Sequence, residues 1–84
     1  MLHESHPNII RRLKRAEGHL RSVIEMFGEG RNCVDLAQQL HAVESAVSSA
    51  KRELIHDHIE HCFDDPNRSD RNTLKEMKAL AKYL

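Results

Sequence analysis

Residues 36–54 read LAQQLHAVESAVSSAKREL, and this stretch decides the fold. Its apolar residues recur at alternating steps of four and three, a heptad repeat that is typical of a helix packed lengthwise against other helices. The repeating positions are Leu36, Leu40, Val43, Val47, Ala50 and Leu54. Neither Gly nor Pro occurs between Asn32 and Asp65. We therefore predict one unbroken helix over about 33–63.

A shorter helix is predicted before it, over about 8–27. Apolar residues again recur there at steps of three and four, which indicates a one-sided helix. Pro7 suits the first turn, and Gly28 and Gly30 favour an end to the helix. Asn32 is then a favourable N-cap for the long helix.

The remaining sequence predicts a third helix over about 70–83, after a loop in DDPNRSDRN. With 84 residues, 4% aromatic and 31% charged, the chain has too little apolar bulk for a large core. We expect a single all-α domain over residues 1–84, with a flexible tail at 1–7 and with self-association. No segment is apolar enough for a membrane span or a signal peptide, so we expect no membrane partner and a cytoplasmic location.

The stretch HDHIEHC at residues 56–62 gathers three histidines and a cysteine near the end of the long helix. His58 shares a helix face with His61 and Cys62, because residues three or four apart are neighbours, whereas His56 points away. Thiolate and imidazole suit Ni(II), Co(II), Cu(I) and Zn(II) rather than Ca(II) or Mg(II). We expect His58 and Cys62 to be metal ligands, with His61 as a further candidate.

The second cysteine, Cys33, lies at the start of the long helix. Along an unbroken helix it stands about 43 Å from Cys62, so the two cannot meet within one chain. If both are ligands, Cys33 comes from a second chain whose helix runs antiparallel, with the two-fold axis near Ala46–Val47. The sequence then predicts an isologous dimer with two equivalent metal sites. The alternative is that Cys33 is a small buried residue.

Two histidines near the start of the chain, His3 and His6, offer additional nitrogen ligands. Extra nitrogens raise the coordination number and favour Ni(II) or Co(II) over trigonal Cu(I). We expect one of the two to join the main site, with His3 preferred because it is nearer the terminal amine. His19 and His41 have no ligand partners at helical spacing and are expected on polar faces.

Basic residues gather on the first helix, opposite its Leu13–Leu20 stripe. In a chain with a net charge of zero, this asymmetry indicates a phosphate-binding surface. No helix-turn-helix signature is present, so contacts to DNA shape and backbone are expected rather than base reading. The alternative is a solvated amphipathic face. The candidate DNA-binding residues are Arg11, Arg12, Lys14, Arg15, Arg21, Lys51 and Arg52.

The segments RLKRAEGHLRSVIEM, LAQQLHAVESAV and HDHIEHC, with Cys33 between the first two, resemble the CsoR/RcnR family of metal-sensing transcriptional repressors. The resemblance covers about residues 5–84 and is closest to the nickel-responsive NreA-like branch. It implies an antiparallel dimer that pairs into a tetramer. It also implies binding of double-stranded operator DNA without metal, release by Ni(II) or Co(II), and derepression of metal-efflux genes.

The family's ligand pattern falls on Cys33, His58 and Cys62, and its basic residues match Arg12 and Arg15. Asn32 occupies the position where copper sensors of the family commonly have Tyr, which argues against copper. Many members also carry an arginine in the middle of the long helix, where this chain has Glu44.

Two alternative functions stay open at this point. One is a Cu(I)-sensing or Zn(II)-sensing repressor of the same fold, and the other is a cytosolic metal-buffering helical bundle. The sequence contains no nucleophile–base–orienter set and no phosphate loop, so we do not expect an enzyme.

Overall fold

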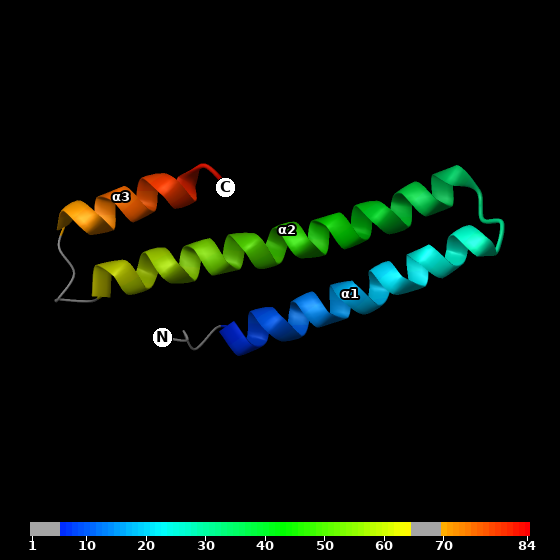
Figure 1. The fold of residues 1–84 in the computed structure, drawn as a ribbon, viewed down its shortest axis with the longest axis horizontal. Coiled ribbons are helices and arrows are strands. Elements are labelled where there is room, and N and C mark those ends of the chain that lie inside the picture. The colour runs from blue at the N-terminus through cyan, green and yellow to red at the C-terminus, as the bar shows by residue number, and fades with distance from the viewer. Residues whose placement is uncertain (1–5, 65–69) are drawn as a thin grey trace.

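In the computed structural model, the described backbone comprises residues 6–64 and 70–84. It forms three helices in the order α1 (His6–Gly28), α2 (Cys33–Asp64) and α3 (Asp70–Ala81). This part of the chain contains no strand, which confirms the all-α class. Figure 1 shows α2 as a long central rod with α1 along one side and α3 along the other. The Cα trace measures 56 × 23 × 12 Å, so the three helices form a single thin layer.

The outer helix ends differ slightly from the prediction. α1 begins at His6, two residues earlier than expected, so positions 6 and 7 belong to the helix and not to the tail. Pro7 is tolerated there because the N–H that it lacks would have no partner in a first turn. α3 ends at Ala81, two residues early. Tyr83 N–H donates to the Leu80 carbonyl at 3.0 Å, a contact three residues back that closes the last turn.

The turn between α1 and α2 reverses the chain. Gly30 has a φ of +75°, a left-handed conformation that favours glycine. Asn32 then caps α2, since its Oδ1 accepts the Asp35 N–H at 2.8 Å, which confirms the predicted N-cap. Arg31 pairs with Asp35 at 2.9 Å. This hydrogen bond is the largest cause of a raised pKa at Arg31.

The core is a narrow seam between α1 and α2. On each helix the buried apolar residues recur at every seventh position, as in an antiparallel coiled coil. They are Ile9, Ala16 and Val23 on α1, and Leu36, Val43 and Ala50 on α2, joined by Ile55. The Leu13–Leu20 stripe therefore lies beside the seam of α1 and stays exposed. Two paired helices can cover only one strip of each other's surface, so half of each apolar repeat faces outward.

Candidate metal centre and nucleic-acid interface

The outward half of the α2 repeat forms an exposed apolar stripe. Leu40, Val47 and Leu54 lie seven residues apart and are 41%, 45% and 40% exposed. Cys33 stands seven positions before Leu40, and its thiol is exposed. His61 stands seven positions after Leu54. Each heptad step drifts by only about 20° around a straight helix, so neighbouring members of this series share a face, and Val47 is the midpoint of the series.

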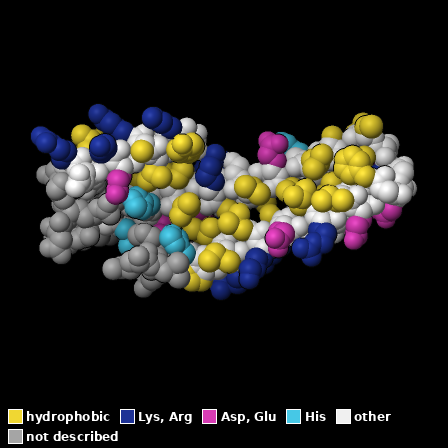
Figure 2. Space-filling view, viewed as in Figure 1, with side chains coloured by type: hydrophobic (Ala, Val, Ile, Leu, Met, Phe, Trp, Pro, Cys, Tyr) yellow, Lys and Arg dark blue, Asp and Glu magenta, His cyan; other side chains and the backbone are white. Residues whose placement is uncertain are grey.

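The two helices contribute to the same apolar face. Hydrogen bonds join α1 to α2 on the opposite side of the seam, from Arg12 to Glu53 and from His19 to Gln39. Because these polar contacts share one face of the hairpin, the exposed Leu13 and Leu20 of α1 must share the other with the α2 stripe. Figure 2 shows hydrophobic side chains exposed along the length of the hairpin. This face is available to a second copy of the chain.

At the histidine-rich end of α2, the helix α3 holds His58. Glu76 Oε2 lies 3.0 Å from His58 Nε2. A carboxylate accepts hydrogen bonds, so Nε2 carries the proton in the neutral ring and Nδ1 keeps its lone pair. A carboxylate partner on one ring nitrogen is the usual arrangement of a metal-binding histidine. The contact between His58 and Glu76 matches this arrangement.

His61 is held in a different way. Its Nδ1 donates to the Asp57 backbone carbonyl at 2.8 Å and lies 3.3 Å from Asp57 Oδ1. His61 is therefore restrained by its own helix, whereas His58 is restrained by α3.

The other predicted ligands are placed as follows. Cys62 lies within α2, but its side chain is outside the described residues, as is His3. His6 is the first residue of α1 and is half-buried. Within 6–61 and 71–84, no three His, Cys, Asp or Glu side chains converge on a common point. α2 is unbroken, as predicted, so Cys33 and His58 stand at opposite ends of one rod.

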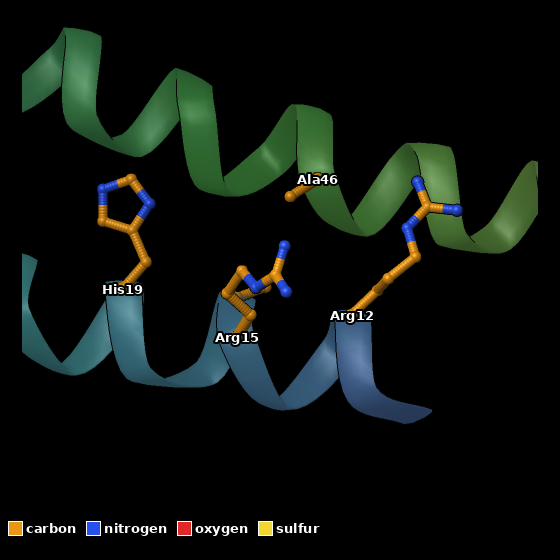
Figure 3. A pocket seen from close by; sticks show the side chains of 5 residues that line it. Arg12, Arg15, His19 and Ala46 are labelled. Atoms are coloured by element: carbon orange, nitrogen blue, oxygen red, sulfur yellow. The ribbon is translucent and has the colours of Figure 1, made fainter. Parts of the chain in front are cut away.

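The basic residues of α1 divide into two groups. Arg12 Nη1 donates to Glu53, and its Nη2 donates to Ser49 Oγ at 2.7 Å, so this cation is engaged within the chain. Arg15 and His19 instead line a pocket of about 170 Å³ with Arg12, Ala16 and Ala46. Figure 3 shows the Arg15 and His19 side chains directed into the space between α1 and α2.

The remaining candidates for DNA contact are exposed, as Arg15 also is. They are Arg11, Lys14 and Arg21 on α1, and Lys51 and Arg52 on α2. Arg52 Nη1 makes a long contact of 3.5 Å with Ser48 Oγ on its own helix. These five cations therefore keep their charged groups at the surface.

Comparison with known proteins identifies the family. The family model described as "Metal-sensitive transcriptional repressor" matches residues 5–83, nearly the whole chain. The chain belongs to this family. Membership confirms the resemblance at the level of the family, while the nickel-responsive branch stays a prediction. Because the family consists of transcriptional repressors, membership also supports the prediction that the chain is not an enzyme.

Several relatives of this repressor family bear copper-sensing names. The copper-sensing transcriptional repressor CsoR of Mycobacterium ulcerans is 44% identical over 54 residues, which are 64% of this chain and 46% of that protein. CsoR of Bacillus subtilis is 39% identical over 61 residues, 73% of this chain and 60% of that protein. RicR of Mycobacterium tuberculosis is 38% identical over 55 residues, 66% and 57% respectively. The chain spans about half the length of the curated relatives it matches.

Sequence reasoning missed two carboxylates at the candidate sites of this chain. Glu76 faces His58 across 18 sequence positions, and Glu53 faces Arg12 across 41. No local spacing rule connects residues so far apart. A weak signal was present for Glu76, because it is the acidic residue among the basic residues of 71–82.

Proposed function

We propose that this chain is a cytoplasmic, metal-responsive transcriptional repressor that binds operator DNA in its metal-free form and releases it when metal binds. The observation that carries the proposal is the exposed stripe from Cys33 to His61 with Val47 at its centre. Antiparallel pairing of two α2 helices about Val47 sets Leu40 opposite the partner's Leu54. The same pairing brings Cys33 to the partner's histidine-rich end.

Each composite site would then contain Cys33 from one chain and His58 with Cys62 from the other. Neutral imidazole and thiolate are borderline-to-soft donors, which suit late first-row metals. We propose Ni(II) or Co(II) as effector, with His3 or His6 as an added ligand. Cu(I) is the second candidate, favoured by the copper-sensing names of the relatives. Zn(II) fits the same donors.

In this proposal, two contacts would link metal capture to the neighbouring helices. His58 is hydrogen-bonded to Glu76, so a change in the orientation of its ring would be transmitted to α3. Farther along α2, Glu53 and Ser49 hold Arg12 of α1, so a shift of α2 changes how this cation is presented. A coupling free energy of about 1–3 kcal/mol would weaken DNA binding about 5- to 150-fold. The dimers would pair into a tetramer, which would present the basic residues of both dimers to duplex DNA.

A mixed-dimer experiment tests the composite site. One variant carries Cys33→Ala, and a second carries His58→Ala with Cys62→Ala. Neither alone should bind Ni(II), Co(II) or Cu(I) tightly under anaerobic conditions. After co-refolding, each mixed dimer contains one intact site, made of Cys33 from one chain and His58 with Cys62 from the other. Tight binding should return at up to one site per mixed dimer.

The controls separate the rival functions. Each variant refolded by itself reports background binding, and tagged subunits confirm that mixed dimers have formed. Confirmed mixed dimers without a recovered site would contradict the antiparallel arrangement. A second measurement distinguishes a metal buffer from a repressor. A metal buffer would not bind duplex DNA, or would bind it with an affinity that does not change on titration with each metal, as followed by fluorescence anisotropy.

A further inference from the structure

Four basic side chains lie along α3 and the turn that follows it. Arg71, Lys75 and Lys78 lie on α3 at steps of four and three, which places them on one side of the helix, and Lys82 follows four residues later in the turn after its end. All four are exposed. Figure 2 shows Lys and Arg side chains crowded over α3, at the upper left of the molecule. We call these four residues the α3 basic stripe.

Within the described residues, no carboxylate pairs with the stripe. Glu76 lies between its members in sequence, but it accepts the His58 hydrogen bond on the side of α3 that faces α2. The neighbours within the stripe are therefore all of like charge, which destabilises a helix. The whole chain has 13 basic and 13 acidic residues, so a general excess of Lys and Arg does not explain this concentration.

We propose that the α3 basic stripe binds the sugar–phosphate backbone of duplex DNA, as a contact surface additional to α1. The inference rests on the proposed function and extends it to residues outside the family's ligand pattern. The stripe is about 16 Å long at 1.5 Å per residue, and duplex DNA presents one negative charge per ~1.7 Å of its axis. Lysines without interleaved base-reading side chains suit backbone contacts, which carry no sequence information.

The charge balance of the two surfaces supports this assignment. On α1, Arg12 is already neutralised by Glu53, whereas the stripe has no such partner among the described residues. Figure 1 places α3 on the opposite side of α2 from α1, so the stripe adds a second basic edge rather than duplicating the first. Phosphates would relieve the repulsion within the stripe by direct pairing.

The test uses the full chain without metal and a fluorescein-labelled 40-bp duplex of mixed sequence. Lys75→Gln with Lys78→Gln removes two charges from the stripe, and Lys75→Arg with Lys78→Arg keeps them. Anisotropy titrations at several KCl concentrations give the slope of log K against log salt. Loss of two phosphate contacts should reduce this slope by about 1.8 and the affinity at 0.1 M salt by about 50-fold. The arginine variant should bind as the wild type does.

A second variant, Lys82→Gln, guards against a folding defect in the double variant, because it lies in the last, exposed turn. It should reduce the slope by about 0.9, with circular dichroism unchanged. If the wild type binds the duplex and neither glutamine variant changes the salt slope, the inference is overturned and the proposed repressor function stands. No duplex binding by the wild type at any salt would overturn both. A change in oligomer mass without a change in slope would assign the stripe to a second copy of the chain and overturn the DNA contact.

Discussion

The two ends of α2 are built differently. At the first end, Cys33 is the first residue of α2 and is exposed. Arg31 forms ion pairs with Glu29 before it and with Asp35 after it. At the other end, His58 is already oriented by Glu76 of α3. One end offers a sulfur donor near a turn whose carboxylates are occupied, and the other offers an oriented nitrogen donor.

The contrast teaches that, among the described side chains, neither end of α2 gathers three metal-binding groups by itself. A rod of 32 residues separates them, and at 1.5 Å per residue its ends are about 48 Å apart. In the proposed dimer, the apolar stripe between them would join unlike ends, because a face centred on Val47 is complementary to itself in an antiparallel pairing. Substitutions at Val47, at Cys33 and at the histidine-rich end of α2 should therefore have different effects.

The largest effect is expected at the centre, from Val47→Glu. In an antiparallel pairing both copies of residue 47 meet near the two-fold axis, so two carboxylates would replace two valines. Loss of about 1.5–3 kcal/mol of apolar burial per side chain would raise the dimer dissociation constant about 10²- to 10⁴-fold. Sedimentation equilibrium measures this constant.

The matched control for Val47→Glu is Ser45→Glu. Ser45 is exposed, and its position two residues away places it on a different side of α2. The same charge added there should leave association nearly unchanged. Equal effects of the two substitutions, or none from Val47→Glu, would mean that the stripe is not the dimer interface.

The next effect concerns the sulfur end. Cys33→Ala removes a ligand of both composite sites in the dimer but leaves the Asn32 cap in place. Structural metal sites bind with about 10–16 kcal/mol shared among about four ligands, so the loss of one should weaken metal binding by roughly two orders of magnitude. DNA binding by the metal-free protein should be preserved. Isothermal titration and anisotropy measure the two quantities, and a variant that fails to fold or to bind DNA would identify Cys33 as a structural residue.

Much of this contrast could be predicted from the sequence because its causes are local. The Asn32 cap, the left-handed glycine at position 30 and the absence of helix breakers in α2 act within a few residues of the chain. Each therefore leaves a recognisable signature in one short segment. The separation of Cys33 from the histidine-rich end followed directly from the unbroken helix.

Other features could not be predicted because they depend on which surfaces meet. Periodicity shows that Val43 and Val47 are both apolar, but it does not show that Val43 packs within the chain while Val47 stays exposed. The partners of Arg12 and His58 come from other helices, and the reach of long side chains decides those contacts.

The smallest effect is expected at the histidine end, from Glu76→Gln. Glutamine can still accept the His58 hydrogen bond, so the ring stays in place, but the negative charge that makes Nδ1 a stronger donor is lost. Changes to such supporting residues cost about 10- to 100-fold in metal affinity. We expect a loss near the lower limit, because the hydrogen bond itself is kept.

The matched control for Glu76→Gln is Glu60→Gln, which removes the same charge from an exposed position near the same end of α2. General electrostatic attraction of a cation would weaken equally in both variants and would fade at high salt. A specific role for Glu76 predicts a loss of metal affinity in the first variant alone, and the loss should persist in 0.5 M salt. The salt test is decisive because His58 is half-buried against α3, where mobile ions screen a contact less than they do at the surface.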